Sequence, residues 1–287
     1  MYRVFAATLT LFALSAFALA SGAVAEGNPD IAALQVGLRG RGLYAGTVDG
    51  VLGPGTEAAL RRFQRSKGLA ANGVPGPRTR KALGRYGRRA PLGRRQLSIG
   101  ERGWDVAALQ FALAWQGFPS GNFDGFLSSH TDSALRRFQR RAGIRPDGVA
   151  GPATVAALRG PVPRCRLRLA RPLIAPVGDV FGPRGNRFHA GVDFPAQTGT
   201  PVGAALAGTV VFAGPGGSGW GNLVEIKHGN GVRTRYAHLS RIDVRLGARV
   251  AGGSTVGLVG STGESTGPHL HFEVLVRGAN VDPLAVF

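Results

Sequence analysis

Two histidines flank a single leucine in the segment Ser265–Val274, which reads STGPHLHFEV. They are His269 and His271, two of only six histidines in the chain, and the residues around them are typical of a strand. Because side chains two positions apart on a strand point to the same face, both imidazoles should face one way. On its own, such a pair is more often two half-buried polar residues on a solvated face. A functional site therefore needs partners from elsewhere in the chain.

The segment RFHAGVDFP supplies two such partners. His189 and Asp193 stand four residues apart, so they share a face if the segment is a strand, and Gly191 between them leaves room on that face. The spacing would suit a helix as well, but the glycine, valine and proline of the segment argue against one. A further histidine, His238, lies near the end of the run RTRYAHLS. Four histidines and an aspartate thus fall within one predicted sheet.

Two imidazoles and one carboxylate are a usual ligand set for a catalytic zinc ion, with a fourth position left for water. Zinc lowers the pKa of that water to about 7, so that hydroxide is available near neutral pH. If all five side chains were ligands, no open position would remain. We therefore expect three ligands, and the remaining imidazoles would be free to transfer a proton or to stabilise an oxyanion.

Three further polar residues near these motifs are ambiguous. His228 precedes a predicted turn and is most simply an ordinary strand-end residue. Arg184 in FGPR would either help to bind substrate or brace its own loop, and the sequence does not decide between the two. Glu273 shares a face with the paired histidines on a regular strand, which allows a hydrogen bond to one of them but does not require it.

The elements that must position these residues form an antiparallel sheet domain, predicted over residues 178–287. Short runs rich in valine and isoleucine alternate with glycines there, as in GTVVFAGPG, STVGLVG and HLHFEVLV. The Asn230-Gly231 pair between two such runs is a strong hairpin signal. A proline-rich connection, residues 161–177, precedes the domain and is expected to be a linker.

The N-terminal half is a tandem repeat. Ala59–Arg65 and Ala134–Arg140 both read ALRRFQR, and one constant offset aligns the two copies without a gap. Two copies are too few for a solenoid, so we predict a duplicated small domain over residues 28–88 and 97–160. Each copy should hold three short helices, because apolar residues recur at helical spacing between glycine stops and helix-starting prolines. The predicted fold class is two small three-helix all-α modules followed by an antiparallel all-β domain.

The first residues carry an export pattern. Arg3 precedes an uncharged apolar run from Val4 to Ala20, and small residues suited to cleavage end at Ala25. The pattern predicts a secretory signal peptide over residues 1–25, although ~20 apolar residues could also remain as a membrane anchor. In either case the remaining chain should lie outside the cytoplasm, without stable membrane insertion once the signal is cleaved. The single cysteine, Cys165, cannot form an internal disulfide, and we assign it no role.

Positive charge is concentrated in the repeat. Between Glu26 and Arg171 the chain has 25 Lys or Arg and nine Asp or Glu, whereas from Pro172 onward the counts are nine and seven. Such a field attracts polyanions and weakens as salt rises. In an exported protein the candidates are anionic wall polymers, acidic lipid surfaces and extracellular nucleic acid. The alternative is that these arginines simply cover solvated faces.

The repeat resembles the peptidoglycan-binding domain of bacterial cell-wall hydrolases. The resemblance covers residues 30–85 and 100–160 and rests on LQxxL, DGxxGPxTxxALRRFQ and GVxGPxTxxAL. It implies a module that binds wall glycopeptide and has no catalytic residues. The second copy reads FLSSHTDSALRR where the first reads VLGPGTEAALRR, so the two copies need not bind equally. His130 in this segment is expected to lie in the capping region of a helix and not to bind metal.

The C-terminal half resembles the lysostaphin-like M23 metallopeptidases. The match covers residues 178–284 and rests on FGPR, HAGVDF, GTPV, HGNGVRTRYAHLS, STGPHLHFEV and NVDP. The resemblance implies that His189, Asp193 and His271 are the ligands of one zinc ion. It also implies that His238 and His269 are the catalytic pair that handles the proton and the oxyanion.

Together these features predict a secreted zinc endopeptidase that cuts peptide bonds in peptidoglycan stem peptides or cross-bridges. Two binding modules would hold it on the cell wall, and it would act as a monomer. The alternative is a non-catalytic wall-binding regulator of other hydrolases, against which the intact metal motifs argue. A nucleic-acid-binding role for the basic helices is disfavoured by the export signal. The sequence does not show which bond is cut, or whether the wall is the cell's own.

Overall fold

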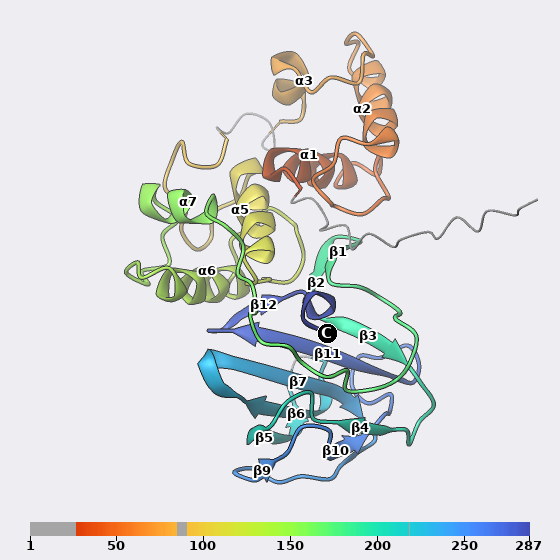
Figure 1. Ribbon diagram of the computed structural model, residues 1–287. Coiled ribbons are helices and arrows are strands. Elements are labelled where there is room, and N and C mark those ends of the chain that lie inside the picture. The colour runs from red at the N-terminus through yellow and green to blue at the C-terminus, as the bar shows by residue number, and fades with distance from the viewer. Residues whose placement is uncertain (1–26, 85–90, 218) are drawn as a thin grey trace, which may run out of the picture.

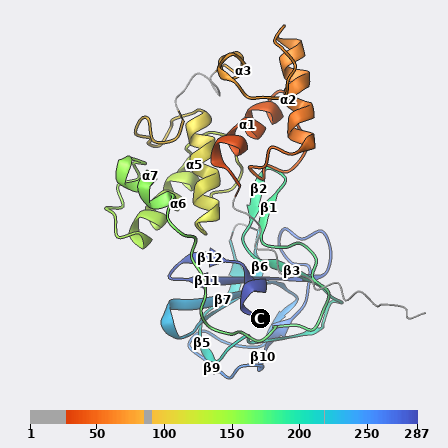
Figure 2. The same cartoon turned by 45° about the horizontal axis from the view of Figure 1, so that its top comes forward.

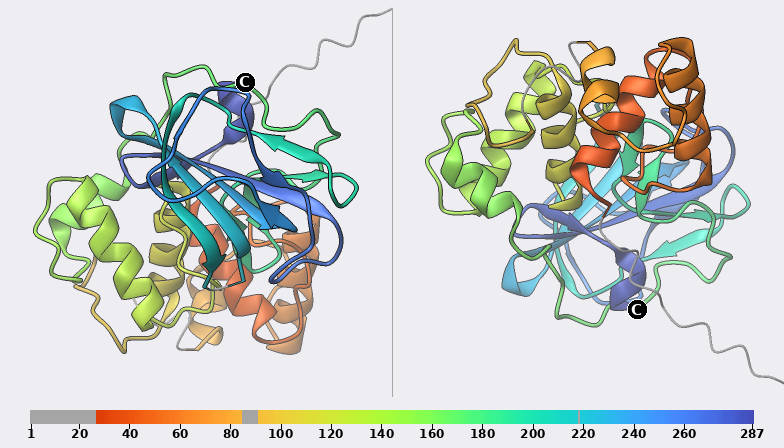
Figure 3. Two further views of the ribbon diagram at one scale, coloured as in Figure 1. Left: turned by 90° about the horizontal axis from the view of Figure 1, so that it is seen from below. Right: turned by 90° about the horizontal axis from the view of Figure 1, so that it is seen from above.

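The computed structural model describes residues 27–84, 91–217 and 219–287 (Figure 1). The predicted signal peptide lies outside these residues. Within them, six α-helices form the N-terminal part, and a β-sheet domain follows. None of the described helices has the length and apolar character needed to cross a membrane. Figures 2 and 3 show the helices gathered beside one end of the sheet domain.

Three helices form each copy of the repeat, here called module 1 and module 2. Prolines occupy the first turn of four of the six helices, where a missing N–H costs nothing. The side chain of Ser128 caps the second helix of module 2, so His130 lies just inside that helix. The helices are α1 (Pro29–Arg39), α2 (Pro54–Ser66) and α3 (Pro77–Ala82) in module 1, and α5 (Trp104–Trp115), α6 (Ser129–Arg141) and α7 (Pro152–Leu158) in module 2.

A buried glutamine holds each inter-helix loop in place. In module 2, the Nε2 atom of Gln139 donates to Asp147 at 2.9 Å and to the carbonyl of Val149 at 3.0 Å, while its Oε1 accepts from the N–H of Gly148 at 3.0 Å. Gly148 has φ +73°, which suits glycine. The same arrangement recurs at three other glutamines, each bonded to an Asp-Gly or Asn-Gly loop. They are Gln35, Gln64 and Gln110.

The sheet domain is antiparallel throughout the described residues. Its main sheet has seven strands in the order β12-β11-β7-β6-β5-β9, with β3 pairing the first half of β11, and a smaller sheet has the order β4-β10-β8. Strands β1 and β2 form a separate hairpin. The strands are β1 (Gly182–Arg184), β2 (Arg187–His189), β3 (Val192–Pro195), β4 (Pro201–Gly203), β5 (Gly208–Gly216), β6 (Gly221–Lys227), β7 (Val232–Leu239), β8 (Arg241–Ile242), β9 (Arg249–Val250), β10 (Thr255–Leu258), β11 (His269–Val276) and β12 (Ala279–Val281).

Local sequence accounts for the turn between β6 and β7. Asn230 and Gly231 adopt φ values of +58° and +73° between β6 and β7, which is the turn that the pair predicts.

The connection at residues 161–177 has no regular structure, but it is not a free linker. Its Leu169 and Leu173 are buried in the core of the sheet domain, and the N–H of Leu169 donates to the carbonyl of Val286.

The β1–β2 hairpin joins the modules to the sheet domain. At its tip, the carbonyl of Gly185 accepts from Val48 of module 1 at 2.7 Å, and the carbonyl of Asn186 accepts from Phe123 of module 2 at 2.6 Å. Phe188 on β2 is buried in a core cluster made mainly by the two modules, and its ring lies 5.4 Å from that of Trp115. The modules are therefore docked on the domain that carries the histidines (Figure 2).

His228 belongs to a buried chain of hydrogen bonds and contributes nothing to the histidine cluster. Its Nδ1 donates to the carbonyl of Ala207 at 2.9 Å, and its Nε2 lies 2.8 Å from the hydroxyl of Thr234, which in turn bonds Tyr236. Burial lowers the pKa of His228 below its ordinary value, although the bond to Ala207 opposes this. The structural role expected for this residue agrees with its contacts.

Replacing Gln139 with alanine should lower the free energy of unfolding by about 1–3 kcal/mol, because it leaves the Gly148 N–H without its partner in a buried loop and removes one bond each to Asp147 and Val149. Urea unfolding followed by circular dichroism measures this. The exposed Lys67→Ala variant is the control and should change stability by less than about 0.5 kcal/mol. Equal stability of the two variants would contradict the role of the buried amide.

The stability of the protein should fall as the pH drops below about 6.5, in part through His228. Since the pKa of this imidazole is lower in the folded chain, the unfolded chain binds a proton first, and folding loses free energy until the folded pKa is reached. Between pH 7 and pH 5 the melting temperature of His228→Gln should therefore fall less than that of the wild type. Both proteins are measured with zinc in excess. His130→Gln, at an exposed position, should keep the wild-type loss. Identical pH profiles for wild type and His228→Gln would refute this.

Candidate metal centre

Three strands bring His189, Asp193 and His271 together. His189 ends β2, Asp193 lies in β3, and His271 faces Asp193 in the antiparallel register of β3 with β11. The single strand predicted for RFHAGVDFP is wrong, because the chain leaves β2 after His189 and enters β3 only at Val192. A Cβ atom on Gly191 would lie 2.3 Å from the carbonyl oxygen of Phe272, so only glycine lets the chain pass this close to β11.

One nitrogen of each imidazole and one carboxylate oxygen converge on a common point. The Oδ1 atom of Asp193 lies 3.1 Å from Nε2 of His189 and 2.7 Å from Nδ1 of His271. The two imidazole nitrogens are 3.0 Å apart. All three ligand atoms lie within 4.8 Å of one another. Of the residues that the structure describes, this is the only such group of His, Cys, Asp or Glu side chains.

The opposite nitrogen of each imidazole has an acceptor. Nδ1 of His189 donates to the carbonyl of Val180 at 2.9 Å, and Nε2 of His271 lies 3.4 Å from Oε1 of Glu273. Protons at these outer positions leave lone pairs on the two nitrogens that face Asp193. Two lone pairs and a carboxylate oxygen repel one another unless a cation lies between them. The donor set and its outer hydrogen bonds therefore fit a divalent zinc ion.

Glu273 is itself held by an arginine. Arg235 donates to Glu273 at 3.3 Å and to Glu225 at 2.7 Å, and Arg233 also bonds Glu225. Glu273 and Glu225 are both buried. The network fixes the position of the Glu273 carboxylate beside His271. The hydrogen bond that the sequence allowed for Glu273 is therefore present, although it is long.

The electrostatics of the cluster favour a positive charge. Burial by itself would raise the pKa of Asp193, but when the two imidazoles carry their protons on the facing nitrogens instead, they donate to Asp193 and hold its pKa well below its usual range. Burial would lower the pKa of His271, yet the carboxylates of Asp193 and Glu273 outweigh that effect and raise it to about 9. Both directions are those of a site that favours positive charge beside the Asp193 carboxylate.

His238 and His269 form a second pair of imidazoles beside the cluster. Their ring centroids are 4.8 Å apart, and Nε2 of His269 lies 3.9 Å from Oδ1 of Asp193. Nδ1 of His238 donates to the carbonyl of Thr262 at 2.8 Å, and Nδ1 of His269 donates to that of Gly267 at 2.8 Å. In both rings the Nε2 atom is left available for chemistry.

His238 adopts an unusual backbone conformation. Its φ of +59° is left-handed, which costs a non-glycine residue energy and often marks a functional position. Its N–H donates to the carbonyl of Trp220 at 3.0 Å, and the Trp220 ring lies 5.5 Å from that of His271. Burial lowers the pKa of His238, an effect that the bond to Thr262 partly offsets. The ring is therefore neutral near pH 7.

Several residues of the site could not be found in the sequence. The carbonyl groups of Val180, Thr262 and Gly267 orient three imidazoles, but a backbone carbonyl gives no residue-type signal. Trp220 lies against His271 without any motif of its own. Arg184, which the sequence left undecided, bonds Asp179 at 2.7 Å and lies 3.4 Å from the second oxygen of Asp193. It therefore braces a ligand carboxylate, whichever other role it has.

An antiparallel sheet domain with a His/Asp/His cluster able to hold a metal ion, beside two further imidazoles, is the arrangement expected of a metallohydrolase. Residues 187–283 match the family model "Peptidase family M23", and residues 27–83 and 102–158 match "Putative peptidoglycan binding domain". The chain therefore consists of an M23 metallopeptidase domain preceded by two peptidoglycan-binding domains. The family resemblance and the multidomain fold class expected from the sequence are confirmed.

Characterised relatives match this chain in the peptidase domain. The DD-carboxypeptidase/endopeptidase Mpg of Neisseria meningitidis serogroup B is 51% identical over 100 residues, which are 35% of this chain and 23% of that protein. The peptidoglycan DD-endopeptidase ShyA of Vibrio cholerae is 47% identical over 96 residues, 33% of this chain and 22% of that protein. The chain thus spans about a quarter of the length of these relatives. The catalytic domain of lysostaphin from Staphylococcus simulans is 38% identical, with a TM-score of 0.36, over 38% of this chain and 90% of that one.

Replacing Glu273 with glutamine should weaken zinc binding by about tenfold, because the amide removes the charge that polarises His271. Competition with a chromophoric chelator measures the affinity. Glu264→Gln is the matched control, since Glu264 is exposed on a loop and bonds none of the ligands. If the two variants bind zinc equally well, Glu273 has no part in holding the metal.

Proposed function

We propose that this chain is an exported zinc endopeptidase that hydrolyses peptide bonds in the stem peptides or cross-bridges of peptidoglycan. The observation that carries the proposal is the convergence of His189 Nε2, His271 Nδ1 and Asp193 Oδ1 beside two imidazoles with free Nε2 atoms. The peptidoglycan endopeptidases among the relatives, and the two binding domains, support peptidoglycan as the substrate.

His189, Asp193 and His271 would hold one zinc ion. When bound, zinc would act as a Lewis acid toward the scissile carbonyl and lower the pKa of a water molecule. The protein's own part is to fix the ligand tautomers through Val180 and Glu273, so that lone pairs face the ion. Three protein ligands leave a coordination position open, as catalytic zinc sites require.

His238 and His269 would manage the proton and the negative charge. Each has Nδ1 anchored on a carbonyl, so each can accept a proton at Nε2 from the attacking water and return it to the leaving amine. A protonated His269 would face Asp193 at 3.9 Å, which stabilises its charge. A ring in that state can also donate to the oxygen of the tetrahedral intermediate.

The two modules would hold the enzyme on the wall. Their charge excess suits an anionic polymer, and their family match supports binding of peptidoglycan. The proposed domain limits remain 28–88 and 97–160 for the two modules and 178–287 for the sheet domain. Residues 161–177, between the second module and the sheet domain, pack on the sheet domain. Export by the segment at residues 1–25 would bring the protein to its substrate.

Two variants distinguish the proposed metal-binding role of His271 from the proposed catalytic role of His269. His271→Ala should lose both bound zinc and hydrolysis of purified peptidoglycan, because it removes a ligand. His269→Ala should keep zinc and lose about 10²–10⁴-fold in rate, the range expected for loss of a general acid or base. Zinc content by mass spectrometry and fragment release by chromatography measure the two effects, and mass analysis of the fragments identifies the bond cut.

His130→Ala is the control for both variants and should match the wild type, because it lies on an exposed helix start. An unchanged rate in His269→Ala would refute the assignment of the catalytic pair. A wild-type protein that binds zinc and sediments with the wall but releases no fragments would instead support the non-catalytic regulator.

A further inference from the structure

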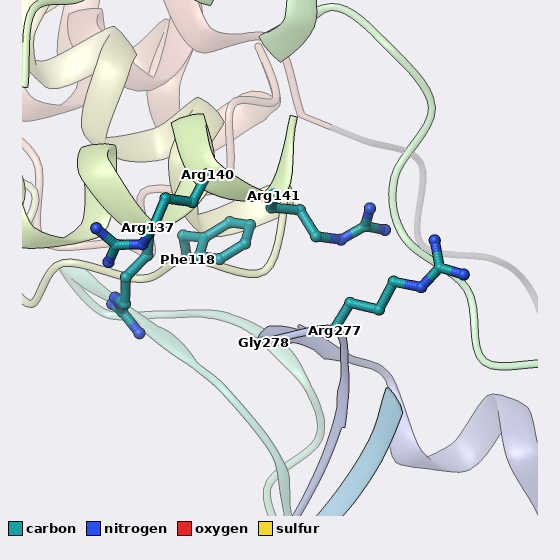
Figure 4. Close-up of a pocket in the computed structure, with 6 residues that line it drawn as sticks. All are labelled: Phe118, Arg137, Arg140, Arg141, Arg277 and Gly278. Atoms are coloured by element: carbon teal, nitrogen blue, oxygen red, sulfur yellow. The ribbon is translucent and has the colours of Figure 1, made fainter. Parts of the chain in front are cut away.

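A pocket lined by arginines lies between module 2 and the peptidase domain. It has a volume of about 370 Å³ and is lined by residues of α6, of the loop after α5, and of the turn between β11 and β12. Figure 4 shows the side chains of Arg141 and Arg277 extending on one side of Phe118, while those of Arg137 and Arg140 lie on the other. The lining is Phe118, Arg137, Arg140, Arg141, Arg277 and Gly278.

The positive charges of this pocket are not neutralised by the part of the chain that the structure describes. The guanidinium groups of Arg140, Arg141 and Arg277 take part in none of its ion pairs or hydrogen bonds, and the buried Nε atom of Arg141 has no partner. Arg137 makes a 3.5 Å bond to the carbonyl of Pro119 and lies 5.9 Å from the centroid of the Phe118 ring. Loss of hydration, together with nearby guanidinium groups, lowers the pKa of Arg137. Arg141 and Arg277 extend together on one side of Phe118 with no carboxylate of the described residues bonded to either, and they leave a site for an anion.

The repeat shows that the pocket belongs to module 2 and not to the helical fold as such. Arg62 and Arg65 of α2 correspond to Arg137 and Arg140 of α6, but Ser66 stands where module 2 has Arg141. Arg62 donates to a loop carbonyl at 2.8 Å, as Arg137 does more weakly. The third arginine is therefore an addition specific to the module that faces the peptidase domain.

The turn that supplies Arg277 has an arginine at a position where its backbone conformation favours asparagine or glycine. Arg277 and Gly278 have φ values of +51° and +83°, the conformation in which asparagine or glycine is preferred at the first position. The same chain uses Asn230-Gly231 for the matching turn between β6 and β7. An arginine in a left-handed conformation is unfavourable, and such residues gather at functional sites. This turn places its guanidinium group at the pocket (Figure 4).

The pocket is also within reach of the metal centre. Arg277 follows β11 six residues after His271, which is about 20 Å along a strand. Arg137 is close enough to Glu273 and Arg235, the residues behind His271, to interact with their charges. A polymer that enters the metal centre can therefore also contact the pocket on the same molecule.

We propose that Arg141 and Arg277, with Arg137 and Arg140 adding positive charge to the same pocket, bind a carboxylate of the peptidoglycan peptides while a neighbouring part of the same polymer lies at the metal centre. The inference rests on the proposed function, because it takes the wall as the substrate. A guanidinium group matches a carboxylate with two parallel hydrogen bonds, and free carboxylates recur along the peptides of the wall. The pocket accommodates one such group with its neighbours, and the Phe118 ring offers an apolar surface beside it.

The test uses two substitutions that the chain itself shows to be compatible with its fold. Arg141→Ser introduces the residue of module 1, and Arg277→Asn introduces the sequence of the β6–β7 turn. The double variant R141S/R277N should keep the wild-type melting temperature. It should bind purified peptidoglycan about tenfold more weakly in sedimentation at 4 °C and constant salt, as loss of charged hydrogen bonds predicts. R65S/K67N removes the same charge from module 1 and should stay close to the wild type.

Chemical modification of the wall identifies the ligand. After its carboxylates have been converted to amides with carbodiimide and ammonia, wild type and R141S/R277N should bind it equally. The inference fails if the two proteins bind native wall equally, or if their difference survives amidation. A different outcome is that inorganic phosphate displaces the protein from the wall at concentrations where acetate has no effect. That result would assign the pocket to a phosphate-bearing polymer and refute the proposed carboxylate ligand.

A parallel assay keeps this inference separate from the proposed function. Fragment release by the wild-type protein tests the endopeptidase, whereas the binding comparison needs no turnover. Failure of fragment release with a clear difference in binding would leave the pocket standing. Normal fragment release together with equal binding of wild type and R141S/R277N would refute the proposal for the pocket and leave the endopeptidase proposal intact.

Discussion

The site depends on the antiparallel pairing of β3 with β11, which sets Asp193 directly opposite His271. His189 reaches the same point only because the chain turns sharply at Gly191, whose Cα passes against the carbonyl of Phe272. Three ligand atoms from positions 82 residues apart in the sequence are thereby fixed without any flexible loop between them and the sheet. Rigid strands hold a metal geometry better than loops do, because their positions are set by the hydrogen bonds of the sheet.

A common device orients all four imidazoles of the site. Each ring has one nitrogen bonded to a carbonyl or a carboxylate, so its tautomer and plane are fixed and its other nitrogen is directed to the site. The difference between ligands and free imidazoles lies in what the second nitrogen meets. In His189 and His271 it meets Asp193, whereas in His238 and His269 no bonded partner in the described residues occupies Nε2.

The sequence predicted the residue types of the site and the class of the fold, but not the contacts that orient them. Alternation on β11 placed His269 and His271 on one face, and the Asn230-Gly231 turn was visible from its dipeptide. The break between His189 and Val192 was not visible, because it follows from a backbone approach to another strand. The carbonyls that orient the rings carry no residue-specific signal. The Arg277 turn could have been suspected only by comparing it with the better turn at residue 230.

Two contacts link the binding modules to the candidate metal centre: the short strand β2, and Asn280 of β12, whose N–H donates to the carbonyl of Gly117 and whose side chain donates to that of Ala190. Successive residues of β2 point to opposite sides, so that Phe188 is buried mainly among module residues while His189 faces Asp193. Withdrawing the modules would expose the Phe188 ring, at a cost of about 2–3 kcal/mol, and would release the hairpin bonds at Gly185 and Asn186. His189 would then keep its bond to Val180, and Ala190 its bond to Asn280, but the hairpin would have lost its packing against the modules. The modules, which match a peptidoglycan-binding family, therefore also stabilise the strand that carries His189, a proposed metal ligand.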